Sequence, residues 1–148
     1  MSAPYEAGGP PSGAPGGKTS LGLDSNVGAM LCYIANILCC LGIILSVVFL
    51  ITEKENRFVK FHALQSLFLF AVYVVLSIVI EILGAILRIA SLDFVSFFVT
   101  WGLWCVVSLI ILAFWLLAGM KAYGGQWYKL PGVGGIAWNM VNKESPRA

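Results

Sequence analysis

Apolar residues form three long, nearly unbroken runs along the chain, and short polar stretches separate them. The runs cover about residues 27–51, 61–88 and 94–118, and charged or small polar residues interrupt them near 52–55 and 90–93. Because a helix rises ~1.5 Å per residue, each run is long enough to cross the ~30 Å hydrocarbon core of a bilayer. The pattern predicts an all-α integral membrane protein with three transmembrane helices.

The second run carries its polar side chains on one face. With ~100° per residue and His62 as the origin, the polar positions from Ser66 to Arg88 fall within about 100° of one another. Uncompensated polar groups are costly in lipid, so this face should turn toward other helices or a wet cavity. The resulting candidate functional stripe consists of His62, Gln65, Ser66, Tyr73, Ser77, Glu81 and Arg88.

Small residues follow a second pattern in the first run, at alternating steps of four and three. This spacing is typical of a helix-packing seam, because small side chains let two backbones approach closely. The seam consists of Gly28, Cys32, Ala35, Cys39, Gly42 and Ser46. Asn36 lies beside it, and packing is a better explanation for Asn36 than contact with a ligand. With three alternating spans, Asn36, Tyr73 and Ser108 come to similar depth, which predicts a small, chiefly structural polar cluster within the membrane.

The two ends of the chain differ from the apolar middle. Residues 1–23 are rich in proline and glycine and are expected to be a disordered tail, whereas residues 24–142 form the membrane domain. Near its end, apolar positions make one face of a short helix at about 132–142, which we expect to lie on the membrane surface: Val133, Ile136, Ala137, Met140 and Val141. Residues 143–148 are a short tail.

Composition supports a membrane protein and argues against several other classes. The chain has 148 residues, 59% of them hydrophobic and 11% charged, and its net charge of +2 is too small to suggest nucleic acid as a partner. Its four cysteines, Cys32, Cys39, Cys40 and Cys105, all lie inside predicted spans, and its single histidine lies at a helix start. We therefore expect no enzyme, cofactor or metal site. The expected partner is the lipid bilayer, with a second copy or other membrane subunits as further candidates.

Basic residues predict the orientation of the three spans. Lys54, Arg57 and Lys60 of the 52–62 loop and all basic residues beyond 120 lie on one side, against Lys18 and Arg88 on the other. The positive-inside rule then places the loop and the C-terminus in the cytoplasm and the N-terminal tail outside.

Three segments of the chain resemble a known family. They are Asn26 with the Ala-Met-Leu-Cys-Tyr start of the first run, the junction ENRFVKFHALQS, and the closing stretch from Ala122-Tyr123-Gly-Gly to Tyr128-Lys-Leu-Pro131. Over about residues 24–142 the chain is similar to small bacterial membrane proteins related to the small helical subunit of the chloroplast inner-envelope protein-import translocon. The most specific match is Phe-His-Ala-x-Gln, at Phe61, His62, Ala63 and Gln65.

The resemblance implies a place in the bacterial inner (plasma) membrane and a non-enzymatic role as a subunit of a transport or protein-translocation assembly. The alternative is a membrane-anchored interaction or scaffold protein without transport activity.

For two single residues the sequence leaves two alternatives each. His62 is either a protonation-sensitive contact or, as we favour, a structural hydrogen-bonding residue. Glu81 either reaches water at the membrane surface, which we favour, or is partly desolvated and suited to proton or cation handling.

Overall fold

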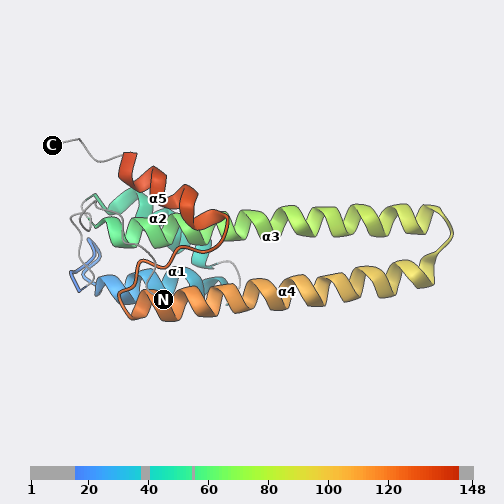
Figure 1. Cartoon of the computed structure of the whole chain (residues 1–148), viewed down its shortest axis with the longest axis horizontal. Helices are drawn as coiled ribbons and strands as arrows, with labels where there is room; N and C mark the ends of the chain where they lie inside the picture. The colour runs from blue at the N-terminus through green and yellow to red at the C-terminus, as the bar shows by residue number, and fades with distance from the viewer. Residues whose placement is uncertain (1–15, 38–40, 55, 144–148) are drawn as a thin grey trace, which may run out of the picture.

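Within residues 16–37, 41–54 and 56–143, which the computed structural model describes, the chain forms five α-helices. They are α1 (Ser25–Ile37), α2 (Leu41–Thr52), α3 (Arg57–Ile89), α4 (Asp93–Tyr123) and α5 (Val133–Lys143). The all-α class is confirmed for this part of the chain. The long helices α3 and α4 run antiparallel, and α1, α2 and α5 gather around one end of the pair (Figure 1). We call this packed end the head, and the projecting part of the pair, residues 71–89 and 93–110, the arm.

The first apolar run does not form the single spanning helix that we expected. The ring of Phe49 lies 3.2 Å from where a Cβ on Gly28 would be, although residues this far apart would be separated by about 32 Å along one straight helix. The chain therefore folds back between α1 and α2, and residues 38–40 at this reversal lie outside the described part. With 13 and 12 residues, the two helices are only about 20 Å and 18 Å long, too short to cross a bilayer.

Glycine explains why this hairpin forms from so apolar a sequence. A Cβ on Gly42 would lie 2.6 Å from the backbone nitrogen of Asn36, so only a residue without a side chain fits where α2 meets α1. The reversal carries no proline or charged cluster that would mark it in the sequence. It also changes where the N-terminal segment lies: the backbone N–H of Ser20 donates to Glu53 Oε1 at 2.6 Å. Lys18 and Lys54 were expected on opposite sides of the membrane, and this contact does not fit that expectation.

The second and third runs lie within α3 and α4, which are the two helices long and apolar enough to cross a membrane. In the most apolar stretch of each helix, only 17% of α3 and 22% of α4 are buried, whereas the core helix of a soluble protein is mostly buried. A tight turn joins them, with Ser91 at φ 59°. At this end Ser96 Oγ donates to Gly84 O at 2.9 Å, and Gly84 lets the two backbones approach.

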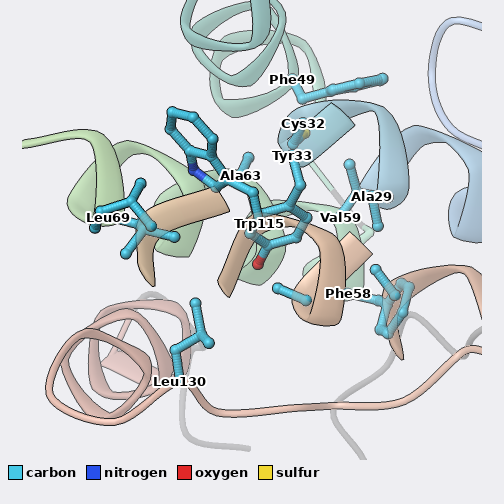
Figure 2. Packing of buried hydrophobic residues seen from close by; sticks show 13 residues of the cluster. Ala29, Cys32, Tyr33, Phe49, Phe58, Val59, Ala63, Leu69, Trp115 and Leu130 are labelled. Atoms are coloured by element: carbon cyan, nitrogen blue, oxygen red, sulfur yellow. The ribbon is translucent and has the colours of Figure 1, made fainter. Parts of the chain in front are cut away.

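The hydrophobic core lies in the head, where side chains from four helices and the segment before α5 meet (Figure 2). Tyr33 of α1, Phe49 of α2 and Phe58 of α3 are completely buried there, and Trp115 of α4 packs among them. The arm is different. Apart from Ile80, Gly84 and Ser96, none of its residues is buried.

A helix forms near the C-terminal end, as the sequence predicted, but one side of it packs on α3. Ala137 and Val141 of α5 are buried against Phe61, whereas Ile136 and Met140 stay exposed. Of the tail expected at 1–23, residues 16–23 form a turn in which Thr19 N–H donates to Leu23 O at 2.7 Å. Residues 1–15 and 144–148 lie outside the described part.

Candidate functional site

The start of α3 places three polar side chains inside the head. Asn56 caps the helix, since its side chain accepts a hydrogen bond from Val59 N–H at 3.3 Å. Gln65 and Ser66 follow His62 by three and four residues, which puts all three side chains on the face that meets α1. All three are completely buried, so each needs partners within the protein.

His62 has a partner on each ring nitrogen. Nδ1 lies 3.0 Å from Tyr33 Oη, and Nε2 lies 3.2 Å from the backbone carbonyl of Gln126. A carbonyl only accepts, so Nε2 carries a proton; since complete burial favours the neutral imidazole, Nδ1 is then the acceptor and Tyr33 the donor. The rings of Phe58 and Phe61 enclose the imidazole, with centroids 4.6 Å and 5.0 Å away.

Gln65 fastens the segment before α5 to the head. Its Nε2 donates to Tyr33 Oη at 2.9 Å and to the carbonyl of Tyr128 at 3.1 Å, and its Oε1 accepts from Leu130 N–H at 3.1 Å. A Cβ on Gly134 would lie 2.7 Å from that Oε1, so the first turn of α5 needs glycine to approach it. The amide therefore joins α1, α3 and the chain that leads into α5.

Ser66 and Asn36 complete this polar network one turn further along α3. Asn36 Nδ2 donates to Ser66 Oγ at 2.8 Å and to the carbonyl of Cys32 at 3.2 Å. Ser66 Oγ donates to the same carbonyl at 2.7 Å. The head network thus consists of Tyr33, Asn36, His62, Gln65 and Ser66, together with backbone groups of Cys32, Gln126, Tyr128 and Leu130.

The structure brings together only the first part of the predicted stripe. Tyr73 lies further along and packs its ring against Trp104 and Trp115, with centroids 5.8 Å and 6.2 Å away. Ser77 Oγ donates to the carbonyl of Tyr73 at 2.7 Å, one helical turn back. Glu81 is exposed and accepts from Trp104 Nε1 at 3.0 Å.

Arg88 is exposed near the tip of the arm. The stripe is therefore divided between the head network and the arm.

The expected intramembrane cluster is not assembled either. Asn36 bonds Ser66 and Cys32, and within the described residues no hydrogen bond joins it to Tyr73 or Ser108. Ser108 is half-buried on α4. The cluster was predicted from depth in a three-span arrangement, and the α1–α2 hairpin changes that depth.

The predicted seam residues lie mostly inside the head. Gly28, Cys32, Gly42 and Ser46 are buried and Ala35 is half-buried, whereas Cys39 lies outside the described residues, as does Cys40. Of the cysteines that the structure describes, Cys32 is a buried free thiol and Cys105 an exposed one. The described residues contain no group of three or more His, Cys, Asp or Glu able to hold a metal ion.

Sequence reasoning missed several groups that matter in the head. Tyr33 forms hydrogen bonds with both His62 and Gln65. Its phenol stands in an apolar run, one position after the seam residue Cys32, and this position could have indicated a buried polar contact. A second polar cluster was not predicted either: Asn56 Nδ2 donates to Ser25 Oγ, and Ser25 Oγ donates to Gly17 O. The backbone partners at 126–130 carry no side-chain pattern from which they could be predicted.

The model of a family described as "Magnetosome magnetite crystal formation protein family" (MamF/MmsF) matches residues 24–141. A UPF0132 membrane protein of Methanocaldococcus jannaschii is 41% identical over 121 residues, which are 82% of this chain and 92% of the relative. A UPF0132 membrane protein of Archaeoglobus fulgidus is 37% identical over 119 residues, covering 80% of this chain and 97% of the relative. No solved structure matches the chain.

These matches correct the family that the sequence motifs suggested. The resemblance to a translocon subunit was wrong, because the matching model is that of the magnetosome-related family and the similar proteins just described are archaeal rather than bacterial. The segment Phe61-His62-Ala63-x-Gln65, which carried the resemblance, instead contributes His62 and Gln65 to the head network. A short motif whose role is to hold a helical head together is a weak guide to the function of the whole protein.

Proposed function

The chain belongs to the MamF/MmsF family of UPF0132 membrane proteins, and from this premise we propose that it is a non-enzymatic membrane scaffold whose α3–α4 arm crosses the bilayer. The family description names magnetite crystal formation, whereas the archaeal relatives are named only as membrane proteins. Only the membrane location, which the names of the relatives state, is applied to this chain; a role in magnetite formation is not proposed for it.

The arm is the observation that carries this proposal. Residues 71–89 of α3 are about 28 Å long, close to the ~30 Å thickness of the hydrocarbon core. Most of their large apolar side chains face outward, with Val75 59%, Ile82 56% and Ile86 57% exposed. Such a surface is unfavourable in water and suited to lipid, so the arm is the part that we place in the membrane.

The head then lies at one membrane surface. Its described basic residues are Lys18, Lys54, Arg57, Lys60, Lys121, Lys129 and Lys143, whereas Arg88 is the one basic residue of the described part near the other end. By the positive-inside rule we assign the head to the cytoplasmic side. Helices α1 and α2 both stay on this side, because neither is long enough to cross the bilayer.

A scaffold accounts for the polar residues better than a transport subunit does. In a transport path we would expect polar side chains along the arm to face one another across a wet interior. Here His62, Gln65 and Ser66 are turned to partners within the head, and they stabilise its packing. In this arrangement Glu81 lies about 15 Å along the arm from residue 71, well inside the core and not at the membrane surface, and its partner there is Trp104 Nε1.

Thiol labelling tests the membrane arrangement directly. The four native cysteines are first replaced by alanine or serine, and single cysteines are then placed at Lys18, Lys54, Ser91 and Lys143. In sealed vesicles of one orientation, we expect a membrane-impermeant maleimide to label positions 18, 54 and 143 from one side and position 91 from the other.

The position-18 variant decides between the two topologies. Three spans would put positions 18 and 54 on opposite sides, whereas the bond between Ser20 and Glu53 requires them on the same side. Labelling of 18 and 54 from opposite faces would refute the proposed arrangement. Labelling of position 91 from the same side as 54 would show that the arm does not cross.

A further inference from the structure

An apolar groove lies where α5 meets α3, at the boundary between head and arm. It has a volume of about 310 Å³ and is open on one side. Residues from α3 and the first turn of α5 form its walls, among them Phe68, Ala71, Val72, Val75, Val133 and Ile136. In the arrangement proposed above, this groove opens into the edge of the hydrocarbon core.

A row of exposed residues leads from the groove toward the outer end of the head. Ile136, Met140 and Lys143 follow one another at steps of four and three, so they share one flank of α5. Ile136 is 53% exposed and Met140 41%, and Lys143 is exposed at the end of the helix. The opposite flank is used for packing, because Ala137 and Val141 are buried against α3.

The distance along this row fits the layers of a membrane. From Ile136 to Lys143 the helix rises about 10 Å, and α5 runs from the arm boundary toward the outer end of the head (Figure 1). The polar headgroup layer on each side of the hydrocarbon core is roughly 5–8 Å thick. Because α5 is inclined to α3 (Figure 1), this rise covers a smaller depth, so Lys143 lies near the outer edge of the headgroup layer when Ile136 lies at the core edge.

We propose that this groove binds one acyl chain of an anionic phospholipid, with the headgroup phosphate at Lys143. The groove supplies an apolar lining for the chain, and the lysine supplies the complementary charge. The inference rests on the bilayer placement proposed above, which thiol labelling tests independently. A wrong placement would show in the labelling pattern, and a wrong lipid site in lipid retention alone.

Native mass spectrometry of the full chain in mild detergent tests the site. The protein is mixed with equimolar phosphatidylglycerol and phosphatidylcholine, and bound lipid is counted. We expect one retained phosphatidylglycerol in preference to phosphatidylcholine. Lys143→Gln should reduce this preference about fivefold, the effect of one basic residue at an anionic lipid surface. The control Lys121→Gln, on the last turn of α4, should leave it unchanged.

A second pair of variants tests the groove itself. Ala71→Trp fills it and should abolish retention of both lipids, whereas Ala113→Trp, at an exposed position of α4 outside the groove, should not. If Ala71→Trp fails to fold, Ile136→Asn removes apolar lining at an exposed position and should lower retention as well.

Three results would overturn the proposal. Equal retention of the two lipids by the unmodified protein would indicate ordinary contact with surrounding lipid. Identical behaviour of Ala71→Trp and Ala113→Trp would place any bound lipid elsewhere. A dimer that Ala71→Trp dissociates would show that a second copy of the chain occupies the groove.

Discussion

Gln65 shows how one side chain can hold separate segments in place. Its amide bonds Tyr33 of α1, the carbonyl of Tyr128 and the N–H of Leu130 while it is completely buried. Leaving a buried polar group without a partner costs about 1–3 kcal/mol, which is more than the net contribution of a hydrogen bond to stability. The amide of Gln65 therefore matters chiefly because its removal would leave other groups unpaired.

Replacing Gln65 by leucine should therefore loosen the segment before α5. We expect Gln65→Leu to lower the free energy of unfolding by about 2–4 kcal/mol, because it leaves the buried N–H of Leu130 and the half-buried carbonyl of Tyr128 without this side-chain partner. Hydrogen exchange at the Leu130 amide should also accelerate. Gln126→Leu is the control, since the network uses only the backbone carbonyl of Gln126. Unchanged exchange at Leu130 in Gln65→Leu would contradict this role.

His62 and Glu81 show how far single residues could be predicted from the sequence. The motif around His62 lies in the head network, and its partners Tyr33 and Gln126 favour the structural role over a pH-sensitive contact, which stays a prediction. For Glu81 the sequence left two alternatives, contact with water or partial desolvation, and neither included a residue of another helix. Its partner is Trp104 of α4, and the spacing within α3 could not reveal a residue on another helix.

The bond between Glu81 and Trp104 yields a second prediction for a single residue. Glu81→Gln keeps an oxygen that can accept from Trp104 Nε1 and should leave unfolding in bicelles unchanged within about 0.5 kcal/mol. Glu81→Leu removes the acceptor and should cost about 0.6–1 kcal/mol, as hydrogen bonds between membrane helices do. If the leucine variant were as stable as the glutamine variant, the bond would contribute nothing to the arm.

Among the helices, the hairpin of α1 and α2 is the element that the hydrophobic pattern could not predict. Hydropathy measures how apolar a run is, and this run is apolar on both sides of the reversal. The glycines that permit the reversal had been assigned to a seam against another helix. Gly28 and Gly42 instead lie between two halves of the same run.

Adding a single methyl group should distinguish these two roles for glycine. Gly42→Ala should destabilise the protein by roughly 1–3 kcal/mol, because its Cβ would overlap the backbone of Asn36. Gly102→Ala in α4 meets no atom within 4 Å and should be neutral or stabilising by up to about 1 kcal/mol. Detergent titration of reversible unfolding measures both. Equal stability of the two variants would show that α1 and α2 do not touch at Gly42.

For the whole molecule, the sequence predicted the helical membrane class but not the division into head and arm. The second and third runs lie within α3 and α4, and the short helix near the C-terminal end formed. Which parts of α3 are covered depends on contacts with α1, α2 and α5. A pattern within one helix cannot show such contacts, so the predicted stripe ran unbroken across a boundary that the fold creates.

The turn between α3 and α4 has a consequence for how the protein is made. In the proposed arrangement, residues 90–92 and their immediate neighbours are all that the described chain sends across the membrane. Arg88 and Asp93 flank this turn with opposite charges, so the net charge to be moved is close to zero. Two apolar helices joined by a short turn with so little charge can insert into a bilayer together, as a helical hairpin. Biosynthesis of the part that the structure describes then requires the export of almost no water-soluble polypeptide.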